Sequence, residues 1–410
     1  MAGPAVLSAG DAPPRLVLVT DGDVGPASRG AGRTLVNLFA RWPTDRLLIA
    51  TSASAQPARD EHGHRVLPAR GWLRGGLAER VAPLLGEMNA AWASVRPLPL
   101  MGAIRDFAPQ LTLVVPTDST ALVWGERALR AVAAPAVTYL MDEWMSAGAH
   151  AWPGGNALAT TRRLLDESTA WLAISEPLAA RMTALAGTRR PTLVVHNPVT
   201  LEAAPPAALA APREGPYRIA YAGSIWPMHL DAIVAVAEST ARLRAQGHDV
   251  RLVLHTDAHG WNAAATTWEA LGVEHGGIVP YAALRERLGE YDLLLVASAF
   301  DAAHAALSRS SLQTKVTDYL AVGRPILACG PTDAASNVYL RAHDCAWLLE
   351  STASEVVDRT LARCIDARAE GQEMARRGYE LVRREHDAER VSARLYAFLA
   401  AAARPGPGAR

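Results

Sequence analysis

Short apolar runs alternate with helical patterns along most of this chain, in two series. A short apolar run fits a buried strand, and the longer segments between the runs space their apolar residues as helices do. This alternation predicts mostly parallel sheets with helices on both faces. The expected strands of the first series are Arg15–Thr20, Leu47–Ala50, Leu111–Val115, Val137–Met141, Trp171–Ser175 and Leu193–His196, and those of the second are Tyr217–Gly223, Val250–His255, Val273–Val279, Leu293–Ala297 and Ile326–Cys329.

The stretch Leu201–Pro216 separates the two series. It is rich in Ala and Pro and has little periodicity, which is typical of a linker. Each series is long enough to form a domain with its own core. We therefore expect a disordered N-terminus (1–14), a first Rossmann-like domain (15–200), a linker (201–216), a second Rossmann-like domain (217–385), a terminal helix (386–403) and a tail (404–410).

The composition excludes several classes of protein. The 410 residues carry a formal net charge of zero, which argues against a nucleic-acid binder. Three cysteines without close spacing favour a reduced, cytoplasmic compartment over a disulfide framework or a zinc site, and no metal motif occurs. No apolar run approaches the roughly 18 residues of a membrane helix. Peripheral contact with a membrane stays open, and the Ala- and Arg-rich usage is typical of a bacterial genome rich in G and C.

The segment Ser308–Pro331 has loop, helix, turn and strand patterns in succession. We expect its helix to end at Gly323, before a short apolar strand. Hydroxyl groups and cations beside a helix N-terminus favour an anion site. Lys315 lies in this segment and is the only lysine of the chain. Either a compact ammonium group is needed at this position, or one lysine survived a compositional bias by chance.

Two places in the first series follow expected strands, where ligands of parallel sheets bind. Gly30 and Gly32 precede a helix, without a dinucleotide or P-loop motif. The run Arg29–Gly32 resembles the loop of GT-B enzymes that admits the donor's phosphates to the backbone, and the alternative is a tight turn that needs glycine. Asp142, Glu143 and Trp144 follow a later strand. Their carboxylates could bind acceptor hydroxyl groups or act as a base, and the indole could stack on a sugar. The alternative is a solvated strand end with a capping aspartate.

The run Gln313–Ala328 reads Gln-Thr-Lys-Val-Thr-Asp-Tyr-Leu-Ala-Val-Gly-Arg-Pro-Ile-Leu-Ala. It resembles the donor-site segment of family-four-like glycosyltransferases, which often reads Pro-Ser/Thr-Lys-Leu-x-Glu-Tyr-Leu-Ala-x-Gly-Lys/Arg-Pro-Val-Leu-Ala. His196–Val199 is similar to the Asn-Pro-Val that ends their first domain. The resemblance spans most of the chain and is better from Tyr217 to Pro331. It implies the GT-B fold, in which two Rossmann-like domains face each other across a cleft and the C-terminal helix crosses back to the first domain.

The resemblance also implies roles for single residues. Asp318 takes the place of the family's second glutamate, which binds the donor ribose, whereas Ser310 replaces the first glutamate. Ser224 and Leu230 stand where the family has the Arg and Lys that bind the diphosphate. Lys315, Arg309 and His229 could supply that charge. The implied donor-binding residues are Gly30, Gly32, Gly223, Ser224, Val279, Tyr281, Arg309, Ser310, Ser311, Lys315 and Asp318; Asp142, Glu143 and Trp144 are the expected acceptor-binding residues, and Asp142 and Lys315 the expected catalytic residues.

The expected function is transfer of a sugar from a nucleotide diphosphate sugar to a hydroxyl-bearing acceptor, without a cofactor. The resemblance implies a retaining, metal-independent enzyme of glycoconjugate, polysaccharide or natural-product synthesis. An inverting reaction would need a base, and Asp142 is the candidate. One alternative is another GT-B enzyme of sugar nucleotides, such as an epimerase or a pseudo-glycosyltransferase. A second is a catalytically silent GT-B binding subunit, which the missing glutamate and cations favour.

Overall fold

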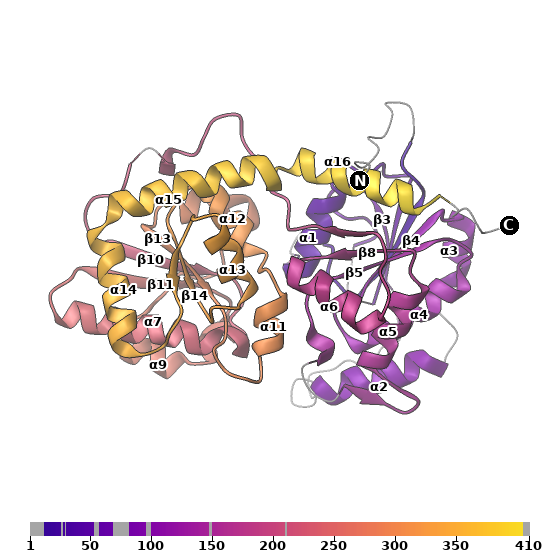
Figure 1. Cartoon of the computed structure of the whole chain (residues 1–410), viewed down its shortest axis with the longest axis horizontal. Coiled ribbons are helices and arrows are strands. Elements are labelled where there is room, and N and C mark those ends of the chain that lie inside the picture. Colours follow the sequence, from indigo (N-terminus) through magenta and orange to yellow (C-terminus); the bar gives the residue numbers. More distant parts are fainter. Residues whose placement is uncertain are drawn as a thin grey trace. The chain divides into compact units, whose positions relative to one another are not determined.

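The computed structural model describes residues 12–25, 28, 30–52, 57–68, 82–95, 100–146, 150–209 and 211–404, without the side chains of 82–86. Most of the expected disordered N-terminus and of the expected tail lies outside these ranges. The chain forms two compact units (Figure 1). Unit 1 comprises Met1–Pro198 and Ala388–Arg410, and unit 2 comprises Val199–Asp387.

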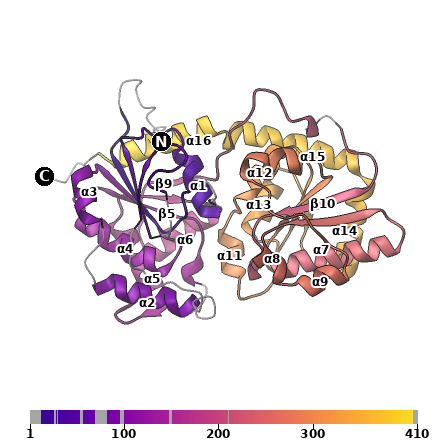
Figure 2. The same ribbon diagram turned by 180° about the vertical axis from the view of Figure 1, so that it is seen from behind.

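Unit 1 contains a seven-stranded sheet of order β3-β2-β1-β4-β5-β8-β9, in which every pairing is parallel. Helices α4 and α5 cover one face of this sheet, with α2 packed on α4, and α1 and α16 cover the other (Figures 1 and 2). β1, β2, β4 and β5 are buried along their whole length, as their apolar sequences predict. The strands are β1 (Leu16–Thr20), β2 (Leu47–Thr51), β3 (Arg65–Pro68), β4 (Leu111–Val115), β5 (Ala136–Leu140), β8 (Ala170–Ala173) and β9 (Thr192–Val194).

The helices of unit 1 begin where the sequence offers capping side chains. Asp118, Asn156 and Ser175 each accept a hydrogen bond from a backbone N–H in the first turn of α4, α5 and α6. A short antiparallel pair, β6 (Ala151–Trp152) and β7 (Gly155–Asn156), precedes α5. The helices are α1 (Gly30–Phe39), α2 (Ala82–Val95), α3 (Met101–Phe107), α4 (Ser119–Ala131), α5 (Ala157–Glu167), α6 (Glu176–Ala186) and α16 (Ala388–Ala402).

The last helix, α16, belongs to unit 1 and packs beside α1. This agrees with the expectation that the terminal helix returns to the first domain. The ring of Tyr396 meets the indole of Trp42 edge to face, with 4.6 Å between the ring centroids. The Tyr396 hydroxyl donates to the Leu38 carbonyl oxygen at 3.4 Å. Because Leu38 and Trp42 are almost fully buried, this contact ties the end of the chain to the core of unit 1.

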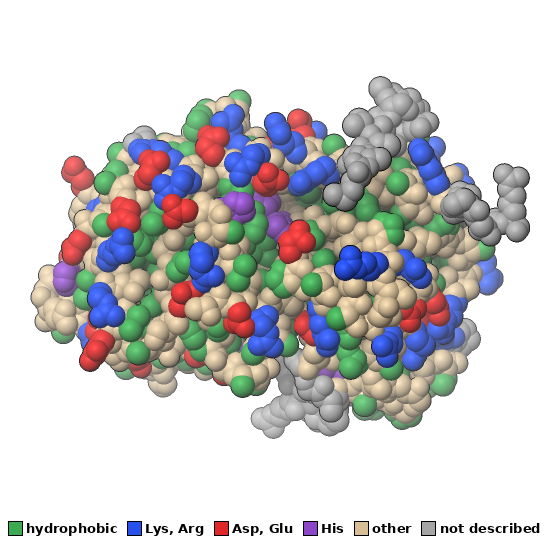
Figure 3. Space-filling view, viewed as in Figure 1, with side chains coloured by type: hydrophobic (Ala, Val, Ile, Leu, Met, Phe, Trp, Pro, Cys, Tyr) green, Lys and Arg blue, Asp and Glu red, His purple; other side chains and the backbone are tan. Residues whose placement is uncertain are grey.

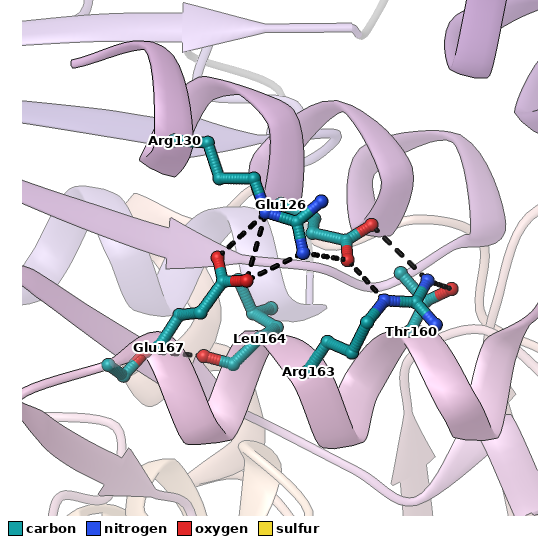
Figure 4. Close-up of polar contacts among 7 residues, drawn as sticks. Glu126, Arg130, Thr160, Arg163, Leu164 and Glu167 are labelled. Carbon is teal, nitrogen blue, oxygen red and sulfur yellow. Dashed lines mark hydrogen bonds and ion pairs between the residues drawn. The ribbon is translucent and has the colours of Figure 1, made fainter.

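Helices α4 and α5 are joined by ion pairs around the buried side chain of Glu126 (Figure 4). Its carboxylate accepts hydrogen bonds from Arg130 at 3.0 Å and from Arg163 at 2.6 Å. Arg130 also binds Glu167 at the end of α5. A buried carboxylate needs such partners, since an unpaired charge would be strongly destabilising.

Unit 2 contains a six-stranded sheet of order β12-β11-β10-β13-β14-β15, which is also parallel throughout. Helices α7 and α14 pack together on one of its faces, and α12 packs with α15 on the other. The strands are β10 (Tyr217–Ala222), β11 (Val250–His255), β12 (Glu274–His275), β13 (Leu293–Ala297), β14 (Ile326–Cys329) and β15 (Trp347–Leu349). On the face of unit 2 shown in Figure 3, basic and acidic side chains are interspersed.

The helices of unit 2 end with two long segments of the amphipathic C-terminal region, α14 and α15, followed by one π-helical turn, Val382–His386. None of the helices in the ranges described above is long and apolar enough to span a bilayer. The helices are α7 (Pro227–Ala245), α8 (Ala258–Asn262), α9 (Ala265–Ala270), α10 (Leu284–Leu288), α11 (Ala305–Ser310), α12 (Lys315–Val322), α13 (Ala335–Ala342), α14 (Ser354–Asp366) and α15 (Arg368–Leu381), with 3-10 turns at Ala207–Leu209 and Tyr281–Ala283.

The expected linker 201–216 belongs to unit 2 and is bound to it along its length. Gln372 donates to the carbonyl oxygen of Ala208 at 3.0 Å, Arg324 to that of Ala211 at 3.1 Å, and Arg368 to that of Arg213 at 2.6 Å. The chain leaves unit 1 after Pro198 and returns after Asp387, so both boundaries differ from the expected residues 200 and 386. The composition of residues 201–216 did not show that they are bound to unit 2, because the side chains that bind them come from much later in the chain.

A buried ion pair stabilises the loop before β3. The Nδ1 atom of His64 lies 2.8 Å from a carboxylate oxygen of Asp60, and Nε2 lies 2.8 Å from the carbonyl oxygen of Trp42. Burial opposes both charges, but these hydrogen bonds outweigh it, so the pKa of His64 is raised above 6.5 and the pKa of Asp60 is lowered below 3.8. Because both ring nitrogens face acceptors, the folded state favours the imidazolium ion.

We predict that His64→Gln lowers the free energy of unfolding by about 3 kcal/mol near pH 6, because it leaves Asp60 as a buried charge without its partner. The raised pKa of His64 makes its contribution complete below pH 6.5 and lost as the pH rises through the folded value. Urea unfolding of both proteins at pH 6 and pH 9 measures this, and the difference should shrink at pH 9. An equal difference at both pH values would show that the charge of His64 contributes nothing.

Candidate functional site

The carboxyl edge of the unit 2 sheet brings together several of the expected donor-binding residues. Gly223 and Ser224 follow β10 directly, and Gly223 has a φ of +135°, which a side chain would make unfavourable. Lys315 begins α12, whose N-terminus lies at this edge. The amide of Gly223 donates to the carbonyl oxygen of His255 at the end of β11, which fixes the turn. Parallel sheets bind ligands beyond their carboxyl edges.

The amino group of Lys315 is buried and has no hydrogen-bond acceptor among the described residues. Its nitrogen lies 3.7 Å from the centroid of the Tyr221 ring, and a Cβ atom at Gly223 would lie 3.2 Å from it. The contact with the ring is a cation–π interaction, which offsets only part of the cost of burying an ammonium group. Burial lowers the pKa of Lys315 to about 7.

The neighbours of Lys315 are held rigidly. The Tyr221 hydroxyl donates to the carbonyl oxygen of Ser224 at 2.7 Å, and the Tyr319 hydroxyl accepts from the amide of Ala222 at 2.7 Å. His229 lies in the first turn of α7 and accepts from the amide of Trp226 at 3.3 Å. Burial, together with the charge of Lys315, lowers the pKa of His229 to about 3. A neutral imidazole therefore lies beside the amino group in the ligand-free protein, and a phosphate-binding charge on His229 stays a prediction.

Asp318 lies one turn after Lys315 on α12 and is buried. Its carboxylate accepts a hydrogen bond at 3.1 Å from the hydroxyl of Tyr281, which lies in the loop after β12. The structure therefore brings the expected ribose-binding residue into contact with Tyr281, another of the implied donor-binding residues. Val279 lies two residues before Tyr281 in that loop and is half-buried. Whether these residues bind a nucleotide stays a prediction.

Arg309, Ser310 and Ser311 lie at the end of α11, whereas the sequence suggested that they lie at the start of the helix that contains Lys315. Ser310 is the last residue of α11, and its hydroxyl donates to the Ala306 carbonyl oxygen at 2.8 Å. Ser311 caps that helix, and Arg309 is half exposed with its guanidinium 3.8 Å from Asp333. Because α12 starts only at Lys315, the hydroxyl of Ser310 does not cap α12; it makes its hydrogen bond within α11.

In unit 1, two glycines at the start of α1 have structural reasons for being there. A Cβ atom at Gly32 would lie 2.0 Å from the carbonyl oxygen of Asp23, so the loop after β1 packs directly on this glycine. Gly30 has a φ of +52° and open space around it. The close approach explains Gly32 without a ligand, and the donor-binding role of both glycines stays a prediction.

Asp142 lies at the carboxyl edge of the unit 1 sheet, close to a second carboxyl group. One carboxylate oxygen of Asp21 accepts from the amide of Thr117 at 3.0 Å, and the other accepts from its hydroxyl. The pKa of Asp142 is raised to about 6, chiefly by burial; the hydrogen bond from Trp144 opposes the rise, and the charge of Asp21 adds to it. Burial likewise raises the pKa of Asp21. Neither aspartate has an ion-pair partner among the described residues.

The other two expected acceptor-binding residues are bound within unit 1. The carboxylate of Glu143 accepts from Arg181 at 2.6 Å and from the hydroxyl of Ser146 at 2.7 Å. The indole N–H of Trp144 donates to the carbonyl oxygen of Pro116 at 3.2 Å, and its ring meets His150 edge to face. These contacts give Glu143 a structural role, and they leave Asp142 as the carboxylate of this group that could receive a ligand.

Sequence reasoning missed two residues that shape these sites. Tyr221 lies in β10, and nothing in the sequence pairs its ring with Lys315. Asp21 follows β1, and its effect on Asp142 depends on the order β1-β4-β5, which no local sequence pattern gives; Thr117, which binds Asp21, follows β4. No group of three or more potential metal ligands occurs in the described part of the chain.

Residues 235–397 match a family model described as glycosyl transferase-like, which covers most of unit 2 and the start of α16. A search of the curated proteins found no match. The solved structures that resemble the chain include HepE of Anabaena in complex with UDP-glucose, at 16% identity and a TM-score of 0.64 over 93% of this chain and 98% of that one. The sucrose-phosphate synthase of Thermosynechococcus elongatus is similar at 12% identity and a TM-score of 0.69 over 93% and 97%.

The chain has the GT-B fold. A glycosyltransferase of Rickettsia africae shares it as well, at 12% identity and a TM-score of 0.63 over 94% of this chain and 97% of that one. The expectation of two Rossmann-like domains with parallel sheets is thereby confirmed, and residues 235–397 are a glycosyltransferase-like segment. Membership of family four in particular stays a prediction, and at these identities the structures show the fold alone.

We predict that Asp142→Asn stabilises unit 1 above pH 6. Because the folded pKa of Asp142 is raised from 3.8 to about 6, its ionisation costs stability as the pH rises through that range. An amide has no such cost, so the variant should gain about 2 kcal/mol over wild type at pH 7.5 and little at pH 4. Urea unfolding at the two pH values measures it. A gain that does not change with pH would contradict the raised pKa.

Proposed function

We propose that this protein transfers a sugar from a nucleotide diphosphate sugar to a hydroxyl-bearing acceptor. The observation that carries the proposal is the buried amino group of Lys315, which has no acceptor among the described residues and lies at the carboxyl edge of the unit 2 sheet. Such a group is costly in the folded protein unless a ligand completes it. An anion at this place would also face the N-terminus of α12, where the helix dipole favours negative charge.

The chemistry of sugar transfer needs this kind of site. A nucleoside diphosphate leaves the anomeric carbon only if its growing negative charge is stabilised, and a cation with a helix N-terminus supplies that stabilisation. Lys315 and α12 would do so without a metal ion, which is why we propose a metal-independent reaction. Asp318 and Tyr281 would bind the nucleoside part. The resemblance to family-four-like enzymes supports retention of anomeric configuration, and the neighbour HepE was solved with UDP-glucose.

The proposal extends to the acceptor and the compartment. Asp142 would bind an acceptor hydroxyl group, because Arg181 binds the neighbouring Glu143, whereas the carboxylate of Asp142 has no cation beside it among the described residues. We place the reaction in the cytoplasm, which fits three buried cysteines that are all free thiols.

One observation favours a catalytically silent binding subunit as the second candidate. Ser310 stands where the related enzymes have a carboxylate near the donor sugar, and its hydroxyl donates to the Ala306 carbonyl oxygen of its own helix. A silent subunit would bind nucleotide sugars without consuming them. Release of free nucleotide from UDP-glucose, ADP-glucose and GDP-mannose, with and without glycoside acceptors, separates the two candidates.

The proposal is tested first by binding. We expect at least one sugar nucleotide of that panel to raise the thermal midpoint of the wild-type protein, since a ligand of the folded state stabilises it by mass action. Lys315→Met keeps the length of the side chain and removes the charge, so the shift should largely disappear. A variant at the distant Arg377, Arg377→Met, is the control and should bind as wild type. Absence of any shift with wild type would contradict the proposed function.

We predict that Lys315→Arg folds normally and loses most transferase activity, with Lys315→Ala losing somewhat more. Arginine keeps the charge but brings a wider, planar head into a space bounded by Gly223 and the Tyr221 ring. A misplacement of about 1 Å can cost on the order of a hundredfold in rate. The loss should appear more in turnover than in donor affinity, because the diphosphate charge grows during transfer. Wild-type turnover in Lys315→Arg would contradict the role of Lys315.

A further inference from the structure

The amino group of Lys315 has to meet two opposing demands. In the ligand-free protein its nitrogen is buried against the Tyr221 ring, with no hydrogen-bond acceptor among the described residues. An ammonium ion carries three N–H donors, and burying them without acceptors is costly, whereas a neutral amine loses much less on burial. With a diphosphate bound, the same position would favour the ammonium ion, because a nearby opposite charge stabilises it.

The groups that face Lys315 do not supply the missing negative charge. Tyr221 on β10 presents its ring, and its hydroxyl is turned to the carbonyl oxygen of Ser224. His229 on α7 is held neutral, since burial lowers its pKa to about 3. On α12 itself, the Tyr319 hydroxyl is bound to Ala222. Asp318 accepts from Tyr281, and no ion pair joins its carboxylate to Lys315.

Groups further away do not supply a negative charge to the amino group either. His304, in the turn before α11, affects His229 electrostatically, and it is itself paired with Asp301 at 2.8 Å. Leu230, one residue after His229, stands where the related enzymes carry a phosphate-binding lysine. The positive charge at this edge of the sheet therefore depends on Lys315, and the charge of Lys315 itself depends on what is bound.

We propose that Lys315 is a neutral amine in the ligand-free protein and takes up one proton from solvent when the diphosphate of a nucleotide sugar binds. This inference rests on the proposed function and adds a coupling between donor binding and protonation. The proton goes to the lone pair of Nζ, and the resulting ammonium ion donates hydrogen bonds to the diphosphate oxygens. No bond of the nucleotide sugar changes in this step.

The coupling has a direct consequence for affinity. Above the pH at which the free amine loses its proton, every binding event must first restore that proton. The dissociation constant for the nucleotide sugar should therefore rise about tenfold for each further pH unit, up to the higher pH at which the bound ammonium ion also loses its proton. Below that pH the amine is already charged, and the affinity should be almost independent of pH.

The chain allows the protonation state to be read without assignment, because it contains one lysine. Protein produced with 13Cε-labelled lysine gives a single lysine resonance in carbon NMR, which moves on titration of the amino group. In the ligand-free protein we expect a midpoint near pH 7, the value to which burial lowers the pKa of Lys315. With saturating UDP-glucose we expect the midpoint to rise by about two pH units or more. Lys315→Arg removes the resonance and verifies its origin.

Calorimetry in buffers of different ionisation enthalpy measures the proton itself. UDP-glucose is a suitable probe because its diphosphate is substituted at both ends and lacks the terminal phosphate ionisation near about 6. At pH 8 we expect the wild-type protein to take up about 0.9 proton for each nucleotide bound. Lys315→Arg, whose side chain is always charged, should bind with no uptake, and Lys315→Met should bind more weakly, also with no uptake.

The outcomes separate the two proposals. A lysine resonance that titrates only above about pH 10 in the ligand-free protein would overturn the neutral amine. Binding of UDP-glucose without proton uptake and without a change of midpoint would overturn the coupling while leaving the proposed function intact. If no member of the sugar-nucleotide panel binds, the proposed function fails, and the coupling that rests on it fails with it; the ligand-free titration still decides whether the amine is neutral.

Discussion

The amino group of Lys315 lies against the Tyr221 ring at the end of β10, and the functional interpretation of unit 2 depends on this contact. Burial removes water from the amino group, the ring offers a weak substitute, and the described residues offer no acceptor. The surroundings of the amino group are held in place by two hydrogen bonds: the Tyr319 hydroxyl accepts from the amide of Ala222, and the Tyr221 hydroxyl donates to the carbonyl oxygen of Ser224. A rigidly held amino group with unsatisfied hydrogen-bonding capacity beside a helix N-terminus is a preorganised anion site, which needs little rearrangement when the anion arrives.

Unit 1 presents the opposite electrostatic situation. At the carboxyl edge of its sheet, Asp21 and Asp142 lie close together, and burial raises the pKa of both. A group that is easily protonated near neutral pH can both accept and donate a hydrogen bond, which suits the recognition of hydroxyl groups. Thr117 binds both carboxylate oxygens of Asp21 and Arg181 binds Glu143, whereas Asp142 accepts one long hydrogen bond, from the amide of Trp144 at 3.3 Å. The carboxyl edge of one sheet thus carries a buried amino group and that of the other carries buried carboxyl groups.

The sequence predicted the two sheets well, because fully buried parallel strands such as β1, β4 and β13 are uninterrupted apolar runs. It missed β3 and β15, which are short, and it made β12 too long, since Gly276, Gly277 and Pro280 end the strand early. The linker prediction assigned residues 201–216 to a spacer, whereas Arg324 and Arg368 bind that stretch to unit 2. Local composition cannot reveal partners that lie more than a hundred residues away.

The candidate site was predictable only in part, for a similar reason. The uniqueness of Lys315 and the pattern around it were visible in the sequence, and so was the pair Asp142 and Glu143. The burial of the amino group, the neutral state of His229 and the different partners of the two carboxylates depend on tertiary contacts with Tyr221, Asp21 and Arg181. The most direct test is a crystal structure of the protein with UDP-glucose. We predict a diphosphate oxygen within about 2.8–3.0 Å of Lys315 Nζ and facing the first turn of α12. A diphosphate bound elsewhere, with Lys315 still unpaired against Tyr221, would contradict this account.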